Sequence, residues 1–466
     1  MDPKTSAMLQ ETTALLANCA DLVRRREAES DVEVLYFQSL ADPKRLHDVV
    51  MTPLAEGAAD ASSVREQPHY RRVTNAEAAV DALLRGEAVV FVSDSAFSAE
   101  IAAPVSRNVQ PPEQETVITG PMDGFTESLN TNLGLIRKRV KSRQLKNVSV
   151  TVGSLSKTAV NILYIEGLAD NRLLNELLRR MNGLDKRAVF DGNMLTQYLS
   201  DDIYSVFPPF LTSERPDVIV SKLTEGKIVG LVDGSPHAFS LPSTFLEFFS
   251  SAEDYYQRWA VGTALRVLRI IAFAISVSFT AIYVAVTTFH YEMIPQSLLL
   301  TLAESRSRVP FPPLYEAMIM EVTIELLREA GARLPTKIGQ TIGIVGGIVI
   351  GQAAVDAGFT SNILIIAVAL SAIASFVIPS YVMSASIRLI RFGMILLAGI
   401  WGNLGIAMGV ALLVIHLGGL TNLGAPYLAP LAPSSGRDLL KAFFRLPQRP
   451  RWSRRGKPSA EGNDSA

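Results

Sequence analysis

The sequence predicts an α/β cytosolic region of two small subdomains, followed by an all-α polytopic membrane domain. Two observations carry this prediction. Of the 466 residues, 48% are hydrophobic and 19% are charged, and the charges are segregated, because the first 260 residues are mixed and polar. Four later segments carry no Asp, Glu, Lys or Arg: 270–289, 338–355, 357–387 and 392–436. Uncharged apolar runs of about 20 residues are long enough to cross the hydrocarbon layer of a bilayer.

The first predicted subdomain covers residues 1–115. We expect a polar helix, a strand, a second helix and a buried strand, in this order: 1–30, 31–40, 75–85 and 88–94. Asn75 is a suitable cap for the second helix, and Gly86 a suitable stop. The alternation of strands and helices is typical of a small α/β domain. A polar segment with prolines at 108–115 reads as the linker that closes it.

The second predicted subdomain covers residues 116–250. Its expected elements are an amphipathic helix, two strands, a helix and a strand that ends in a turn: 124–145, 147–153, 156–167, 171–183 and 226–236. Between them, Glu214, Arg215 and Asp217 gather three charges around a proline. We interpret this group as a structural ion-pair cluster rather than a catalytic dyad.

The residues that enzymes and metal sites use are not arranged for such chemistry. The single cysteine, Cys19, excludes an internal disulfide and a cysteine-based zinc site. The five histidines show no ligand spacing, and the run at 150–158 lacks the glycine that a phosphate-binding loop needs before its lysine. A net charge of −1 gives no overall basic field for nucleic acid. We therefore predict a protein that is not an enzyme, needs no cofactor or metal and binds no nucleic acid.

The predicted membrane domain covers residues 251–430, with about four spans and additional interfacial or re-entrant helices. The candidate spans are 270–289, 338–355, 361–379 and about 393–417. Arg258, Arg266 and Arg269 precede the first span, which predicts a cytosolic N-terminal side. In this arrangement Arg388 and Arg391 fall on the outer side, against the same rule.

The tail, 431–466, carries eight Lys or Arg after Gly436 against three Asp or Glu. We expect it to be disordered and cytosolic. Both termini then lie on the same side of the membrane, which requires an even number of spans.

Four glycines in the second predicted span recur every four residues. Gly339, Gly343, Gly347 and Gly351 form one nearly straight stripe on a helix. In lipid, rows of small residues let two helix backbones approach closely. We interpret the stripe as a helix-packing or oligomer interface; a general enrichment of glycine in membrane helices is the alternative.

Three carboxylates lie between the first two predicted spans. Glu321, Glu325 and Glu329 are spaced so that they share one helix face. Because a carboxylate that faces lipid costs about 2.5 kcal/mol or more, we expect the stripe to face water. In a ring of identical subunits it would form stacked rings of acid, which cation pathways use. A solvated face of an interfacial helix is the alternative.

From about residue 120 to 430, the sequence resembles the A-subunit family of spore germination receptors (the GerA family). The matching stretches include GPMDGFTESLNTN, FPPFLTSERPD, EGKIVGLVDGSP, VPFPPLYEA, REAGARLP and IGQTIGIVGGIVIGQAAV. They occur in the same order as in the family. Pro209 and Ser213 depart from its usual Gln and Thr, and residues 1–115 resemble it only in general layout.

The resemblance implies a multi-pass protein of the spore inner membrane, with both termini on the cytosolic (core) side. Such A subunits work with germination receptor B and C subunits, sense nutrients and start ion release. The resemblance further implies self-association into a ring that conducts monovalent cations. The alternatives are a paralogue similar to stage V sporulation protein AF that aids ion release, or a membrane scaffold or transporter without channel activity.

Overall fold

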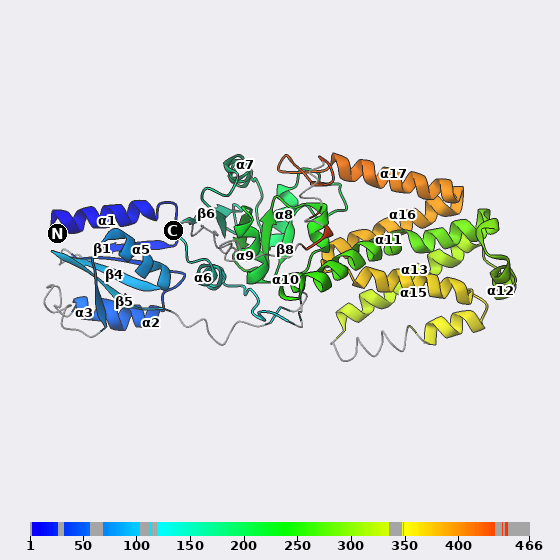
Figure 1. Cartoon of the computed structure of the whole chain (residues 1–466), viewed down its shortest axis with the longest axis horizontal. Coiled ribbons are helices and arrows are strands. Elements are labelled where there is room, and N and C mark those ends of the chain that lie inside the picture. The colour runs from blue at the N-terminus through cyan, green and yellow to red at the C-terminus, as the bar shows by residue number, and fades with distance from the viewer. Residues whose placement is uncertain are drawn as a thin grey trace, which may run out of the picture. The chain divides into compact units, whose positions relative to one another are not determined.

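The computed structural model describes residues 2–26, 32–55, 69–102, 111–112, 115, 117, 119–334, 347, 349–433, 440 and 443–445 (Figure 1). The chain divides into two compact units. The first unit contains Met1–Phe248, Ser380–Ser386 and Val410–Leu428. The second contains Phe249–Pro379, Ile387–Gly409 and Ala429–Ala466.

The first unit begins with a five-stranded antiparallel sheet in the order β1-β2-β4-β5-β3. The strands are β1 Leu22–Arg26, β2 Glu33–Phe37, β3 Tyr70–Val73, β4 Glu87–Val92 and β5 Ser95–Glu100. The helical segments are α1 Pro3–Leu15, α2 Pro43–Arg45, the π-helical turn Leu46–Met51, α3 Thr52–Ala55 and α5 Ala76–Arg85. The expected helix over 1–30 therefore ends at Leu15, because the chain after it pairs as β1 with β2.

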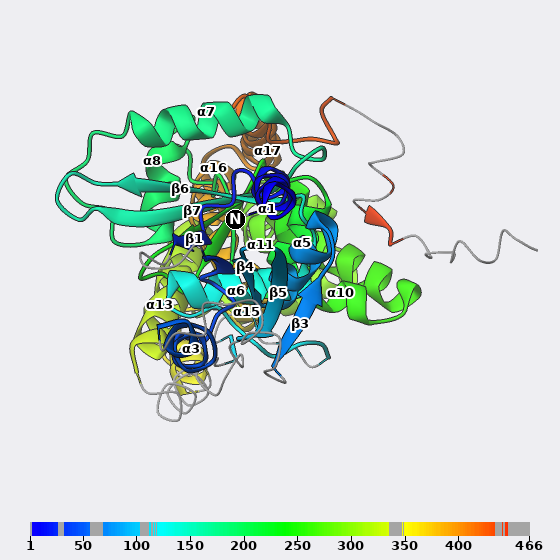
Figure 2. The same cartoon turned by 90° about the vertical axis from the view of Figure 1, so that its left-hand side faces the viewer.

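Both faces of this sheet are covered. Along β4, Val89 and Phe91 pack with residues of α1 and α5, whereas Val90 and Val92 pack with residues of the π-helical turn and α3. This alternation follows from the two-residue period of a strand. Figure 2 shows α1 and α5 together on one side of the sheet and α3 on the other. The helix α5 agrees with the sequence prediction: the Asn75 side chain accepts a hydrogen bond from the Ala78 amide, and Gly86 ends the helix at φ +89°.

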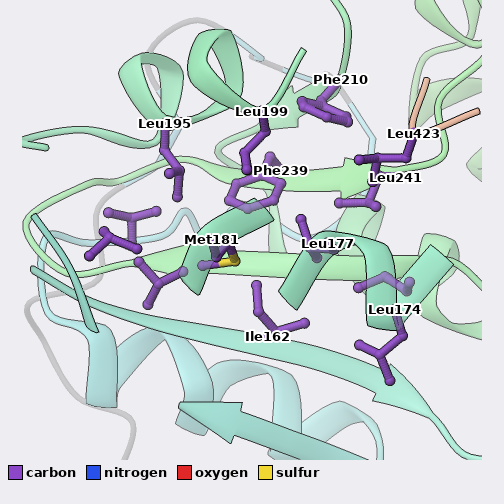
Figure 3. Packing of buried hydrophobic residues seen from close by; sticks show 14 of the residues in the cluster. Ile162, Leu174, Leu177, Met181, Leu195, Leu199, Phe210, Phe239, Leu241 and Leu423 are labelled. Atoms are coloured by element: carbon purple, nitrogen blue, oxygen red, sulfur yellow. The ribbon is translucent and has the colours of Figure 1, made fainter. Parts of the chain in front are cut away.

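A second five-stranded antiparallel sheet follows in the order β6-β7-β9-β10-β8. Its strands are β6 Leu145–Val152, β7 Thr158–Ile165, β8 Leu211–Ser213, β9 Ile228–Val232 and β10 Ala238–Leu241. Its helices are α6 Leu129–Arg139, α7 Asn171–Asn182, α8 Gly192–Leu199 and α9 Pro216–Thr224. One face packs against α7 and α8, as Figure 3 shows for Leu177 and Leu199, and the other packs against α6 and α9. The two expected α/β layouts are thus present as two sheets.

The two sheets of the first unit are joined by a buried ion pair. The Arg137 guanidinium on α6 donates two hydrogen bonds of 2.6 Å to the Asp21 carboxylate, which lies just before β1. The same guanidinium lies 4.1 Å from the ring centroid of Phe37. Beside it, the Ala20 amide donates to the Asn147 carbonyl, and the Asn147 amide donates to the Asn18 carbonyl. Through these backbone hydrogen bonds, residues 18–20, which precede the first sheet, lie alongside β6 of the second sheet.

The second unit is helical. Its elements include α10 Glu253–Tyr256, α11 Trp259–Phe289, a 3-10 turn Tyr291–Met293, α12 Gln296–Arg306, α13 Pro313–Arg333 and α15 Asn362–Phe376, with parts of α16 Tyr381–Trp401 and α17 Asn403–Gly419. Among the described residues, α11 and α16 are long and apolar enough to cross a membrane. The helices α15 and α17 are apolar but shorter. The remaining end of α17 leads to a two-stranded ribbon, β11 Thr421–Asn422 and β12 Ala425–Pro426, in the first unit.

The predicted span over 393–417 is wrong as a single helix. The chain breaks at Gly402, which adopts φ +61°, a conformation that favours glycine, and separates α16 from α17. A Cβ at this position would lie 3.0 Å from the Phe289 ring. Glycine at this position therefore allows the turn between α16 and α17, and it leaves room for Phe289 at the end of α11.

Two pairs of arginines lie inside helices that extend beyond the predicted spans. Arg388 and Arg391 lie inside α16 rather than in an outer loop. Arg266 and Arg269 lie inside α11, which begins eleven residues before the predicted span, because Asp254 provides a buried partner at 2.7 Å from Arg269. Pairing with carboxylates allows both helices to hold charges within otherwise apolar sequences.

Candidate functional site

The candidate site of the second unit is a row of buried and half-buried charges between α13 and α16. The Glu321 carboxylate lies 3.0 Å from Nη2 of Arg391, and the Glu325 carboxylate lies 2.9 Å from Nε of Arg388. Glu321 pairs with Arg391, and Glu325, one turn later on α13, pairs with Arg388, which comes earlier on α16. The two helices therefore run antiparallel. The start of α13 agrees, because a Cβ at Gly399 would lie 2.6 Å from Leu314. The charged face of α13 therefore lies opposite the charged face of α16, and the charges of the two helices pair in order.

Hydroxyl groups from two further helices complete the surroundings of Glu321. The Thr280 hydroxyl on α11 donates to Glu321 at 2.9 Å and lies 2.9 Å from the Ser371 hydroxyl on α15. The side chains of Glu321 and Arg391 are 0% and 1% exposed. The buried Glu321 carboxylate is tolerated because it is paired with Arg391 and accepts a hydrogen bond from Thr280. Four helices therefore meet at the Glu321–Arg391 pair.

A third guanidinium extends the row. Arg328 donates to the Ser375 hydroxyl at 3.0 Å, lies 4.2 Å from the Phe376 ring centroid and lies 4.0 Å from the Glu325 carboxylate. We call Glu321, Glu325, Arg328, Arg388 and Arg391 the charge row. Its three arginines and two carboxylates leave one positive charge in excess. The row can therefore neutralise its own carboxylates, and it retains hydrogen-bonding capacity, because none of the three guanidinium nitrogens of Arg391 has a hydrogen-bond acceptor among the described residues.

The structure separates the three predicted carboxylates. Glu321 and Glu325 belong to the charge row, whereas Glu329 is 58% exposed and pairs with Arg333 on its own helix. The expectation that the whole stripe faces water is therefore wrong for Glu321. Sequence reasoning missed its partners, although two arginines three residues apart in an apolar helix are the signal that could have revealed them.

The glycine stripe is described only in part. Gly347 and Gly351 have no atom within 4 Å of the position of an added Cβ. Gly339 and Gly343 lie outside the described residues. At the two described glycines, the surface is therefore not occupied by another described part of the chain.

The charges around Pro216 form two pairs in the first unit. Arg215 binds Asp217 through two hydrogen bonds of 3.1 and 2.8 Å, and Glu214 lies 3.1 Å from Nε2 of His237. The hydrogen bond to Glu214 raises the pKa of His237. Nearby, burial raises the pKa of Glu115 to about 7, although Ser213 donates a hydrogen bond to this carboxylate. Two groups here therefore have pKa values raised above their ordinary values.

The described residues contain no group of three or more His, Cys, Asp or Glu that could hold a metal ion. The charged side chains of the charge row form ion pairs inside the helix bundle.

The family described as "Bacillus/Clostridium GerA spore germination protein" matches residues 10–458. Spore germination protein GerQA of Bacillus cereus is 41% identical over 460 residues, which cover 96% of this chain and 92% of that protein. Spore germination protein KA of Bacillus subtilis (strain 168) is 36% identical over 463 residues, 96% and 85% of the two chains.

Among solved structures, the N-terminal domain of the A subunit of the Bacillus megaterium spore germinant receptor GerK3 matches with a TM-score of 0.38 and 23% identity. The match covers 51% of this chain and 94% of that one. The assignment does not depend on this match, because the sequence relatives span nearly the whole chain. The chain therefore belongs to the GerA family of spore germination proteins.

Proposed function

We propose that this protein is the A subunit of a nutrient-germinant receptor and that it assembles into a ring which conducts monovalent cations. The names of the relatives, spore germination proteins, support the receptor role. The charge row is the single observation that supports conduction, because it places two carboxylates inside a bundle that also contains two membrane-length helices. In this proposal the protein is a non-enzymatic, multi-pass component of the spore inner membrane, with both termini on the core side and with B and C subunits as partners.

The charge row also suggests how conduction is controlled. In the described conformation, Glu321 and Glu325 each face an arginine, and a neutralised carboxylate attracts cations weakly. Separation of α13 from α16 would expose the two carboxylates to a water-filled path. In a ring they would then form two stacked acidic rings. Nutrient binding to the receptor would have to supply the free energy that separates the pairs.

The glycine stripe is the proposed contact between subunits. Gly347 and Gly351 present backbone without a covering neighbour among the described residues, which suits close approach of a second helix. Replacement of either glycine by leucine would hold the helices apart. We expect such variants to lose the ring and the conductance together.

The experiment that tests this function combines native mass spectrometry with planar-bilayer conductance on the same detergent-extracted protein. A defined ring that conducts cations supports the proposal. In Glu325→Gln we expect lower cation selectivity, whereas Glu329→Gln, a matched change on the same helix, leaves it unchanged. A silent protein, or one whose selectivity ignores Glu325, would instead support a membrane scaffold, a transporter or a paralogue similar to stage V sporulation protein AF.

A further inference from the structure

The segment Asp202–Val206, here called the 202–206 loop, exposes large apolar side chains in a folded part of the first unit. Tyr204 is 90% exposed and Ile203 is 72% exposed. A contiguous apolar surface on a well-packed domain commonly marks a contact with another molecule or with a membrane. We propose that the 202–206 loop lies in the interfacial layer of the lipid bilayer and anchors the first unit to it.

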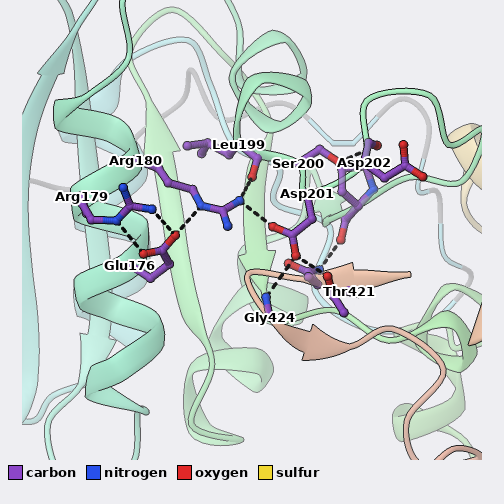
Figure 4. A network of polar contacts seen from close by, with 11 residues as sticks. Glu176, Arg179, Arg180, Leu199, Ser200, Asp201, Asp202, Thr421 and Gly424 are labelled. Carbon is purple, nitrogen blue, oxygen red and sulfur yellow. Dashed lines mark hydrogen bonds and ion pairs between the residues drawn. The ribbon is translucent and has the colours of Figure 1, made fainter. Parts of the chain in front are cut away.

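The loop is held in place by its own hydrogen bonds. The Tyr204 amide donates to the Asp202 carboxylate at 2.9 Å, and the Phe207 amide donates to the Ser205 hydroxyl at 3.2 Å. Just before the loop, Asp201 accepts hydrogen bonds from Arg180, Thr421 and Gly424 (Figure 4). These contacts fix the ends of the loop, so the exposure of Ile203 and Tyr204 is a property of the folded structure.

The loop is continuous with the ends of two apolar helices within the same unit. Its Ser205 hydroxyl lies 3.1 Å from Nε2 of His416 on α17, and the ring centroids of Phe207 and His416 are 6.0 Å apart. At the start of α16, the Ser386 hydroxyl donates to the Val206 carbonyl. The loop therefore lies directly beside the ends of two helices that belong to the predicted membrane domain.

The neighbouring helix segments expose the same kind of surface. Besides the exposed His416, α16 and α17 in this unit expose large apolar or aromatic side chains: Tyr381, Val382, Val410, Leu412, Val414 and Ile415. Tyrosine favours the interface because its ring is apolar and its hydroxyl remains hydrated. Tyr204 and Tyr381 are thus the side chains that a bilayer interface would hold.

Charged groups limit the depth of insertion. Arg180 and Asp201 form an ion pair of 2.6 Å immediately behind the loop, and burial of such groups in hydrocarbon is costly. We therefore place the loop at the depth where the lipid headgroups meet the acyl chains, and not in the hydrocarbon core. The inference rests on the proposed membrane location, and its test separates the two.

The test uses nitroxide labels on the full-length protein in vesicles of phosphatidylcholine and phosphatidylglycerol. The native Cys19 is buried, and burial raises the pKa of its thiol, so labelling is directed to introduced cysteines. Tyr204→Cys reports the loop. Leu155→Cys, an exposed position in the turn after β6, is the matched aqueous control, and Ile282→Cys on α11 reports membrane insertion itself.

Power saturation compares the accessibility of each label to oxygen, which concentrates in lipid, and to a water-soluble nickel chelate. We expect the oxygen-to-nickel ratio at position 204 to be severalfold higher than at 155 and lower than at 282. A ratio at 204 equal to that at 155, with 282 in lipid, overturns the loop anchor and leaves the proposed function intact. Shielding of 204 from both reagents also overturns it, in favour of a protein partner. A water-exposed label at 282 overturns both.

Discussion

Glu321 on α13 and Arg391 on α16 form an ion pair of 3.0 Å, and their side chains are 0% and 1% exposed to solvent. The pair joins two helices that are distant in sequence, and the Thr280 hydroxyl of a third helix donates to the same carboxylate. Removal of one partner from such a pair leaves an uncompensated buried charge, which costs far more than the pair contributes to stability.

Arg391→Ala is therefore expected to destabilise the second unit by about 3–5 kcal/mol. Thermal unfolding of the detergent-extracted protein measures the change. The double variant Glu321→Gln with Arg391→Met removes both charges and is expected to recover most of the lost stability. The exposed pair gives the control, because Glu329→Gln or Arg333→Met should change the free energy of unfolding by at most about 1 kcal/mol. An Arg391→Ala protein as stable as the parent would contradict the buried pair.

The antiparallel register of α13 and α16 leads to a second prediction. Glu325→Arg alone places a third like charge beside Arg328 and Arg388, so we expect loss of stability and of assembled protein. Glu325→Arg combined with Arg388→Glu restores the pair in the opposite sense and is expected to rescue both. Glu325→Arg combined with Arg333→Glu is the matched control. It should not rescue, because Arg333 pairs with Glu329. Equal rescue by both combinations would contradict the pairing of Glu325 with Arg388 and therefore the register of α13 against α16.

Much of the first unit was predictable from sequence because its signals are local. Asn75 and Gly86 determine the two ends of α5, and the alternation in β4 follows from a strand buried on both faces. The end of α1 was not predictable in this way, because strand pairing of Leu22–Arg26 with β2 overrides the helical character of the sequence.

The charge row was only half visible in the sequence. Glu321 and Glu325 stand out by their spacing, but their partners lie more than 60 residues later, and no local rule pairs them. The position of Arg388 followed from the predicted spans and disagreed with the charge rule, and its partner Glu325 on another helix could not be read from the local sequence. Gly402 likewise breaks an uncharged run whose composition alone reads as one helix.

The Asp21–Arg137 pair gives a third prediction, for the joint between the two sheets. Both side chains are buried, and Arg137→Ala would leave the Asp21 charge without its partner. We expect a loss of about 3–5 kcal/mol in stability and faster proteolysis between the two sheets. Limited proteolysis of the full-length protein, followed by mass mapping, measures the second effect. Arg179→Ala, on an exposed face of α7, is the control and should leave the cleavage pattern unchanged. An unchanged pattern in Arg137→Ala would show that the joint does not depend on the pair.

The fourth prediction concerns pH. Burial raises the pKa of Glu115 to about 7 in the folded protein, above its ordinary value near 4.5. The folded state then holds more protons than the unfolded state between these values, so stability falls as the pH rises through this range. His237 acts in the same direction, because the Glu214 carboxylate raises its pKa above 6.5, and the stability that this provides is lost as the pH rises through the folded-state pKa.

We therefore expect the unfolding temperature to fall between about pH 5 and pH 8, and Glu115→Gln to reduce that slope. The carboxylates Asp191 and Glu247 have lowered pKa values, with hydrogen bonds from Ser235 and contacts with Lys222 and Lys227 among the causes, although burial opposes the shift. Their contribution is lost only as the pH falls below their ordinary values, so it does not overlap the window of Glu115. Thermal unfolding across pH 5–8 in the parent and in Glu115→Gln separates the contributions. A parent curve that rises through this range, or a slope unaffected by Glu115→Gln, would contradict a protonated Glu115 in the folded protein.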